Sequence, residues 1–284
     1  GRMILIYHHI APPREAAGIC DGTDDWRLTL APAQLEKQFQ TLLQRDFRFV
    51  GLPELVAAIA RRGWEPWRQV AVTFDDGYAD NYAHALPVLR RFNVPATFFV
   101  TTDHIHQGVA DPRLMNVDQL KELLGFGMTV GAHSRTHPNL LEIPEPRARD
   151  EIFGSKSDLE RALGTRIDLF AYPYGVHHRV QVKLVREAGY TAAVSAGGGA
   201  QNTRLGLFWL FRYGLSANGN SREDRQAFNF LGGTLRGLYR LLRLPEVDPC
   251  WHGCWFHCHG NLLSLALHGF HVEGRTLADM RLVR

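Results

Sequence analysis

Short apolar runs alternate with helix-like segments along most of the chain. Runs typical of buried strands occupy residues 3–7, 49–50, 70–74, 96–100, 128–131, 169–172 and 190–195. Between them, the patterning favours helices at residues 35–43, 53–60, 83–92, 117–124, 147–163 and 180–188. Strands that alternate with helices predict a parallel sheet, because parallel neighbours need a long crossover between them. The sequence therefore predicts an α/β fold, and closing the sheet gives a (β/α) barrel.

The length of the chain fits one such barrel followed by a short extension. The chain has 284 residues, and we expect a single domain over residues 1–244 and a poorly ordered extension over residues 245–284. The extension contains a cluster of possible zinc ligands: Cys250, His252, Cys254, His257, Cys258 and His259. Because their spacing matches no common zinc finger or ribbon, we do not assign them to the chemistry of the barrel.

Composition and charge exclude several classes of protein. The formal net charge is only +3 and no run of Lys or Arg is present, so we expect no nucleic-acid partner. No run of 18 apolar residues predicts a transmembrane helix. Because the chain opens directly into a predicted strand, we expect no signal peptide within it. We expect a monomer that is cytoplasmic as it stands, or in the cell envelope if an export segment lies outside this chain.

Three polar clusters follow predicted strands directly. They are Thr73-Phe74-Asp75-Asp76-Gly77-Tyr78, His133-Ser134-Arg135-Thr136-His137-Pro138 and Ala171-Tyr172-Pro173-Tyr174-Gly175. In a parallel α/β barrel the loops after the strands converge on one face, so residues distant in sequence can share a site there. We therefore expect the three clusters to lie together.

The residue types in these clusters indicate a catalytic metal site. Successive side chains of an extended segment point to opposite sides, so one of the adjacent carboxylates of Asp75 and Asp76 can bind a cation while the other acts as a base. His133 and His137 can converge on the same ion if their loop curls. Two imidazoles and one carboxylate leave positions open for water and substrate, which is typical of hydrolytic rather than structural sites.

In combination, these motifs resemble the polysaccharide deacetylases with the NodB-homology domain, carbohydrate esterase family 4. The resemblance covers about residues 4–215 and includes the opening segment Ile6-Tyr7-His8-His9-Ile10. It implies a distorted (β/α)7 barrel that binds Zn²⁺ or another divalent cation. It also implies that Asp76, His133 and His137 are the metal ligands.

The same resemblance implies the removal of N-acetyl groups from a polysaccharide or a lipid-linked sugar, with release of acetate. Asp75 is then the catalytic base, and the backbone N–H of Tyr174 helps to bind the oxyanion of the intermediate. A general acid protonates the leaving amine. The partner would be an acetylated oligosaccharide, polysaccharide or glycolipid.

The chain departs from the family pattern at two points. The Arg that usually opens the third motif is replaced by Ala171, and Arg212 is either its substitute next to Asp75 or a surface residue. No late motif supplies the general acid, which leaves His8, His177 and His178 as candidates. These departures keep two alternatives open: a catalytically impaired carbohydrate-binding or scaffolding domain, and a hydrolase of a different amide.

Overall fold

A parallel sheet forms the centre of the molecule. The computed structural model describes residues 2–13, 28–61, 68–196, 202 and 206–214, together with the backbone of residues 271–273 and 281–283. The strands of the main sheet are β1 (Arg2–Tyr7), β4 (Arg48–Phe49), β5 (Gln69–Phe74), β6 (Ala96–Val100), β7 (Thr129–Ala132), β8 (Leu169–Ala171), β9 (Ala192–Val194) and β10 (Tyr213–Gly214). Their spatial order is β10-β1-β5-β6-β7-β8-β9, with β4 paired to β5, and every pair is parallel.

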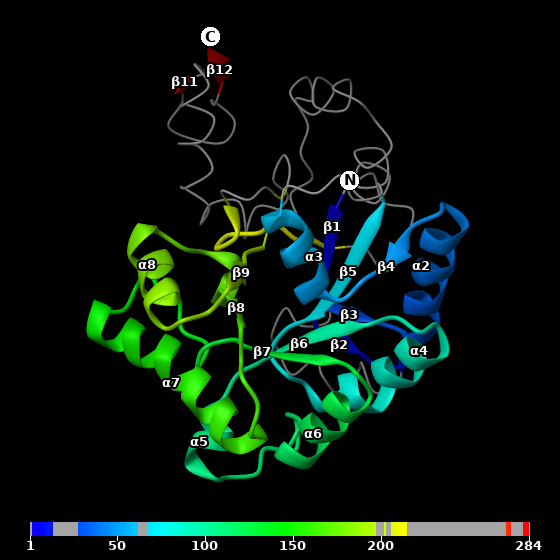
Figure 1. Ribbon diagram of the computed structural model, residues 1–284, viewed down its shortest axis with the longest axis horizontal. Coiled ribbons are helices and arrows are strands. Elements are labelled where there is room, and N and C mark those ends of the chain that lie inside the picture. The colour runs from blue at the N-terminus through cyan, green and yellow to red at the C-terminus, as the bar shows by residue number, and fades with distance from the viewer. Residues whose placement is uncertain are drawn as a thin grey trace.

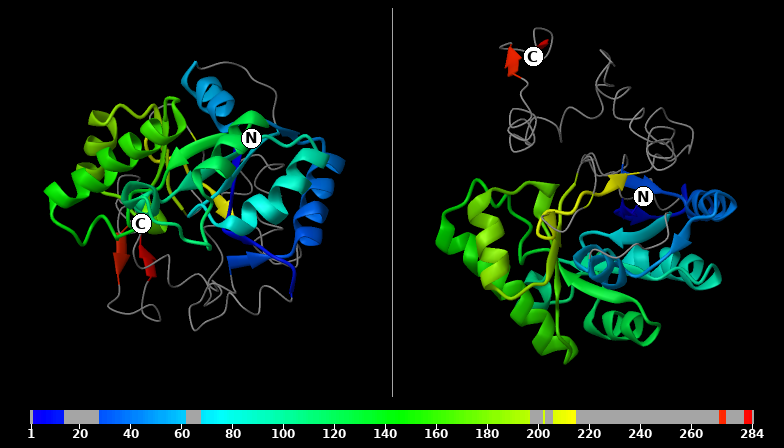
Figure 2. Two further views of the ribbon diagram at one scale, coloured as in Figure 1. Left: turned by 90° about the horizontal axis from the view of Figure 1, so that it is seen from below. Right: turned by 45° about the horizontal axis from the view of Figure 1, so that its top comes forward.

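Apart from α3, the helices lie around the outside of the curled sheet, as Figures 1 and 2 show. They are α2 (Pro32–Gln44), α3 (Leu52–Ala60), α4 (Leu86–Arg91), α5 (Asp103–Gln107), α6 (Val117–Gly125), α7 (Glu145–Leu163) and α8 (Arg179–Glu187). A π-helical turn, η2 (Asn81–Ala85), leads into α4, and a 3-10 turn, η3 (Pro173–Gly175), follows β8. No helix in the described part of the chain is long and apolar enough to span a bilayer.

One segment, residues 206–214, joins the two ends of the sheet. The N–H of Ser195, just after β9, donates to the carbonyl of Leu210 at 2.8 Å, and the N–H of Leu210 donates to the carbonyl of Ala193 at 2.9 Å. A few residues later, β10 pairs with β1 through Leu5 and Tyr213. Because the same segment bonds first to one edge strand and then to the other, the sheet curls into a barrel. The predicted distorted (β/α) barrel is confirmed.

The two faces of the strands pack into two separate apolar clusters. Alternate strand residues such as Val72 and Phe98 face outward and pack with the surrounding helices. The intervening residues, such as Ala71 and Phe99, face the barrel interior. Apolar residues of α3 belong to this interior cluster, so α3 packs against the inside of the barrel. Beyond Ala71 on β5, the same inward register continues through Thr73 to Asp75.

Most predicted elements are present, with boundaries that shift by a few residues. The predicted helix at 83–92 is wrong at its start, because residues 81–85 form the π-helical turn before α4. Pro87 lacks an N–H and its ring would clash with the carbonyl four residues earlier, which a wide turn relieves. The short strands β2 (His9–Ile10) and β3 (Thr29–Leu30) and helix α5 were not predicted, since each is too short to show a period.

The predicted division at residue 245 stays a prediction. Within 245–284 the structure describes only β11 (His271–Glu273) and β12 (Arg281–Val283), which pair antiparallel. The cluster from Cys250 to His259 lies outside the described residues.

Candidate metal centre and active site

The three predicted clusters meet at the carboxyl ends of neighbouring strands. Asp75 and Asp76 follow β5, His133 follows β7, and Tyr174 lies in η3, just after β8. The register brings these strand ends together, because Val100 at the end of β6 pairs with Ala132 at the end of β7, and Ala132 pairs with Phe170 on β8. The loops after the strands therefore share one face of the barrel.

Asp76, His133 and His137 lie close enough together that they could hold one metal ion. Each offers one donor atom, and the three atoms lie within 4.8 Å of one another. Oδ1 of Asp76 is 3.5 Å from Nε2 of His133 and 3.4 Å from Nε2 of His137. Two ligand atoms at about 2.1 Å from a tetrahedral zinc ion are roughly 3.4 Å apart. The donor types and the two separations from Asp76 therefore fit a zinc-like cation.

The surroundings of the two histidines prepare them for this role. Nδ1 of His133 lies 2.8 Å from the carbonyl oxygen of Ala171 and donates to it, which leaves the lone pair of Nε2 free. Burial lowers the pKa of His133 to about 3 and also lowers the pKa of His137. Both rings are therefore neutral near pH 7, as ligation requires.

Arg212 lies inside the barrel and holds Asp75 with two parallel bonds. Its Nη1 donates to Oδ1 of Asp75 and its Nη2 donates to Oδ2, each at 2.6 Å. Nη1 also donates to the hydroxyl of Thr73, and Nε donates to the carbonyl of Ser195 at 2.9 Å. Arg212 is only 1% exposed, so the alternative of a surface position is wrong.

The interior position of Ala171 explains how Arg212 reaches Asp75 from another strand. Ala171 belongs to the same interior cluster as Phe99, and the guanidinium of Arg212 lies over the Phe99 ring. A small side chain at residue 171 leaves the inside of the barrel open to the Arg212 guanidinium. In the family pattern, an Arg of the third motif places its positive charge beside the catalytic Asp. In this chain Arg212, from the segment that closes the barrel, places its guanidinium there instead.

The adjacent carboxyl groups have opposite pKa shifts. Burial alone would raise the pKa of Asp75, but the charge and the hydrogen bonds of Arg212 outweigh it and hold that pKa well below the ordinary value. Burial raises the pKa of Asp76 to about 6, and the neighbouring charge of Asp75 adds to this effect. Asp75 is therefore ionised throughout the neutral range. The raised pKa of Asp76 indicates that its buried charge lacks compensation, which a bound cation would supply.

Backbone strain is concentrated in these loops. Asp76, Ser134, His137 and Tyr174 all have left-handed conformations, with φ between 56° and 68°. Such conformations are uncommon for residues other than glycine and persist where the surrounding structure enforces them, often at functional sites. The side chain of Tyr174 is 58% exposed, and its ring meets that of His137 at a centroid distance of 4.7 Å. Tyr174 therefore forms one wall beside the three ligands.

Of the three candidate acids, the structure brings His8 to the carboxylates. His8 lies between β1 and β2, and its charge is the largest influence that lowers the pKa of Asp76 against burial. His177 instead stacks on Tyr172 at 4.8 Å, and burial lowers its pKa to about 4. His178 is an exposed residue at the start of α8.

The sequence did not identify the residues that hold His8. The side-chain amide of Asn81 donates to the carbonyl of His8 at 2.7 Å, and Oδ1 of Asp80 accepts the N–H of Ile10 at 3.2 Å. The ring of His9 bonds to Oδ2 of Asp80 and stacks on Tyr78. Asp80 and Asn81 follow the first cluster within a few residues, but no spacing rule distinguishes them from ordinary helix-start residues.

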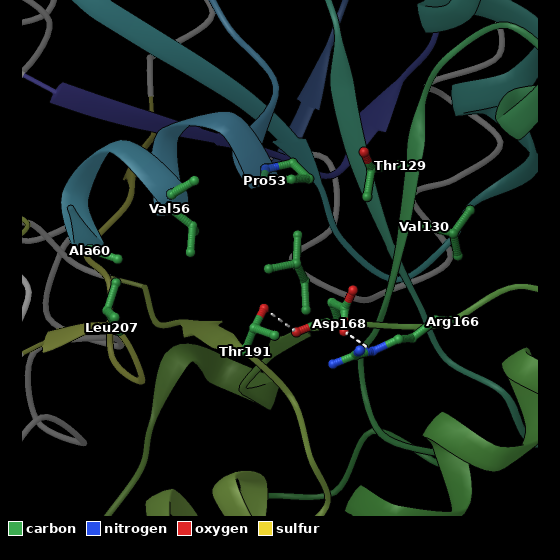
Figure 3. Close-up of a pocket in the computed structure, with 11 residues that line it drawn as sticks. Pro53, Val56, Ala60, Thr129, Val130, Arg166, Asp168, Thr191 and Leu207 are labelled. Carbon is green, nitrogen blue, oxygen red and sulfur yellow. Dashed lines mark hydrogen bonds and ion pairs between the residues drawn. The ribbon is translucent and has the colours of Figure 1, made fainter. Parts of the chain in front are cut away.

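A separate cavity of about 340 Å³ lies at the opposite end of the strands. Figure 3 shows it between α3 and the starts of β7, β8 and β9, with Thr129, Asp168 and Thr191 among its lining residues. Thr129 begins β7 whereas His133 follows its end, so about four residues of strand, roughly 13 Å, separate the cavity from the metal ligands. None of the candidate site residues lines it.

Comparisons with known proteins agree with this geometry. Residues 62–193 match the family model described as polysaccharide deacetylase. The protein YxkH of Bacillus subtilis (strain 168) is 28% identical over 147 residues, covering 52% of this chain and 51% of that protein. The poly-beta-1,6-N-acetyl-D-glucosamine N-deacetylase of Staphylococcus aureus (strain MSSA476) is 25% identical over 171 residues, covering 57% and 59%. The match therefore spans between half and three-fifths of these curated relatives.

A solved structure extends the likeness to almost the whole barrel. The Streptococcus pyogenes deacetylase PplD in complex with acetate superposes with a TM-score of 0.68 and 26% identity, covering 79% of this chain and 96% of that one. The fold is thus a curled (β/α) barrel similar to that of a solved deacetylase. The resemblance to the polysaccharide deacetylases that the motifs indicate is confirmed, with the family model matching a little under half of the chain.

Proposed function

We propose that the chain is a metal-dependent N-deacetylase that removes acetyl groups from an N-acetylated sugar polymer or glycolipid. The observation that carries the proposal is the meeting of two imidazoles and one carboxylate beside a second carboxylate that Arg212 holds in place. A dead binding domain has no need to keep such costly buried polar groups together. The curated relative from Staphylococcus aureus carries the name of an N-deacetylase of poly-beta-1,6-N-acetyl-D-glucosamine, which supports an N-acetylated sugar as substrate.

Asp76, His133 and His137 would hold the cation. A divalent cation such as Zn²⁺ supplies Lewis-acid polarisation of the acetyl carbonyl and lowers the pKa of water at the site. The neutral rings of His133 and His137 and the partly buried carboxylate of Asp76 suit this type of ion better than Mg²⁺ or Ca²⁺, which prefer oxygen ligands.

Asp75 is the proposed general base. Its Oδ2 lies 3.7 Å from Nε2 of His133, so a proton acceptor stands directly beside the proposed ion. Arg212 fixes the orientation of this carboxylate and keeps it ionised, which makes it ready to take the proton of the attacking water. The left-handed turn at Tyr174 directs backbone into the same face, where its N–H is the proposed donor to the oxyanion.

His8 is the proposed general acid. It approaches Asp76 from the end of β1, the strand next to β5, and Asn81 holds its backbone. His177 is a poorer candidate, because its buried ring is engaged with Tyr172. In this arrangement Asp75 removes a proton from water and His8 delivers one to the leaving amine, so the amide bond breaks to give a free amine and acetate.

Acetate release from N-acetylglucosamine oligomers tests the function. We expect turnover by the zinc-loaded chain, loss of turnover after treatment with a chelator, and recovery when zinc is restored. The chelated and restored samples come from one preparation, which controls for unfolding. A chain that binds zinc and the oligomers but releases no acetate would instead support the carbohydrate-binding reading. A chain that turns over other acetylated amides but not these sugars would support a different amide substrate.

Replacing His8 with glutamine tests the acid assignment. We expect acetate release from N-acetylated sugars to fall by about 10²- to 10⁴-fold, because an amine leaves poorly without protonation. Hydrolysis of p-nitrophenyl acetate should fall far less, since its leaving group needs no proton. His177→Phe serves as the matched control and should retain both activities. An equal loss on the two substrates in His8→Gln would contradict the role of His8 as the acid.

A further inference from the structure

The loop that carries both histidine ligands is tied to α7 by a fully buried carboxylate. Glu151 is 0% exposed. Its Oε2 accepts the backbone N–H groups of Arg135 at 2.8 Å and Thr136 at 2.9 Å, and its Oε1 accepts the Thr136 hydroxyl at 2.7 Å. Arg147, one turn earlier on α7, supplies the compensating charge at 2.7 Å. One side chain thus bonds to the two residues that lie between Ser134 and His137.

This loop does not hold its shape by its own preferences. Ser134 and His137 both have left-handed backbone, with φ values of 62° and 56°. Each such residue costs on the order of 1 kcal/mol or more relative to ordinary conformations. The local bond from the N–H of His137 to the hydroxyl of Ser134, at 3.1 Å, offsets only part of that cost. Contacts from outside the loop must therefore offset the rest of this conformational cost.

The side chain of Arg135 provides a second attachment to the same helix. Its Nε donates to Oδ2 of Asp158 and its Nη1 donates to Oδ1 of Asp150, both at 2.8 Å. A Cβ on Gly154 would lie 2.3 Å from the guanidinium carbon, so only glycine leaves room for Arg135 to lie against the helix. Glu151 therefore holds the backbone of the loop while Asp150 and Asp158 hold its side chain.

We propose that Glu151 is a positioning residue for the metal centre, which keeps the His133–His137 loop in its strained, ligand-ready conformation. The inference rests on the proposed metal site and adds to it a residue that touches neither metal nor substrate. Because Glu151 bonds to the backbone of the loop and not to a ligand atom, folding rather than ion binding would order much of the segment before His137. Mutating a residue that orients metal ligands without binding the metal itself typically weakens metal affinity by about 10- to 100-fold.

A zinc titration of Glu151→Gln tests this role in the absence of substrate. The amide keeps the size of the side chain, but it removes the negative charge and, if its oxygen still accepts the backbone N–H groups, turns its NH₂ toward the donor-only guanidinium of Arg147. We expect the dissociation constant for Zn²⁺, measured against a competing chelator, to rise by at least tenfold. The absorption spectrum of the Co²⁺-loaded variant should also change, because His137 no longer takes its position.

Glu160→Gln is the matched control on the same helix. Glu160 also accepts a backbone N–H, that of Ile167 at 3.0 Å, but in a loop away from the metal ligands. We expect this variant to lose some stability and to retain wild-type zinc affinity. Equal zinc affinity in folded Glu151→Gln and wild type would overturn the proposal, as would an equal weakening in Glu160→Gln.

A milder variant covers the case in which Glu151→Gln fails to fold. Thr136→Val removes the hydroxyl bond to Oε1 of Glu151, together with a longer 3.5 Å bond from Arg147 to the same hydroxyl. Thr41→Val removes a hydroxyl bond on the distant α2. We expect zinc affinity to fall by at least threefold in the first variant only, and no difference between the two would contradict the role. A wild-type chain that binds zinc without deacetylating sugars contradicts the proposed function alone, whereas one that binds no zinc contradicts the metal centre itself.

Discussion

Asp75→Asn is expected to lower the rate of acetate release by about 10²- to 10⁴-fold, because the proposed general base is removed. Zinc binding should remain near that of the wild type, since Asp75 is not among the three proposed ligands. The measurement combines the turnover number on N-acetylglucosamine oligomers with zinc content by elemental analysis. The rate constant should fall more than the Michaelis constant changes, because a base acts in the transition state rather than in binding.

Asp76→Asn provides the comparison for this experiment. Its carboxylate lies 3.4 and 3.5 Å from the two histidine nitrogens, so its loss should weaken zinc binding first and activity as a consequence. Excess zinc should then restore part of the activity of Asp76→Asn but none of that of Asp75→Asn. Full activity in metal-loaded Asp75→Asn would show that Asp75 is not the base.

Arg212→Met is expected to lower the free energy of unfolding by about 3–5 kcal/mol, which is typical when one partner of a buried ion pair is removed. The reason is that Asp75, 2% exposed, would remain in the barrel without its compensating charge. Chemical denaturation measures the loss directly. Arg48→Met is the control, because the ion pair of Arg48 with Glu54 is exposed and should contribute about 1 kcal/mol or less.

The pH dependence of Arg212→Met gives a second, signed readout. In the wild type, the lowered pKa of Asp75 contributes stability that is present above the ordinary carboxyl pKa and is lost as the pH falls through the folded value. Without Arg212, burial is opposed less, so the pKa of Asp75 should rise above its unfolded value. The difference in the free energy of unfolding between wild type and Arg212→Met should therefore shrink as the pH falls from 7 toward about 4. A difference that is constant over this range would argue against the pairing.

A double-mutant cycle separates the ion pair from packing. Adding Asp75→Asn to Arg212→Met removes the unpaired buried charge, so the double variant should be more stable than the sum of the single losses predicts. Additive losses would show that the stability of this part of the barrel does not depend on the pairing of Arg212 with Asp75.

Local pattern predicted most of the elements of this protein and the candidate residues of its site. Apolar runs of strand length define β5 and β6 almost to the residue, because a buried strand needs a continuous apolar stretch and nothing else. Asp75, Asp76, His133 and His137 were identifiable as candidate site residues because polar residues directly after such strands lie at the carboxyl face of a parallel barrel. The family resemblance then indicated which of them would bind the metal.

Tertiary structure decided which distant side chains complete the site. Arg212 lies 137 residues from Asp75, and Glu151 appears in the sequence as one acidic residue among several on α7. Nothing in their own neighbourhoods distinguishes them from solvated surface charges. Their roles depend on the closing of the barrel through residues 206–214 and on the packing of α7 against the loop after β7. Sequence pattern reports the period of a single element, whereas the pairing of buried charges depends on where separate elements meet.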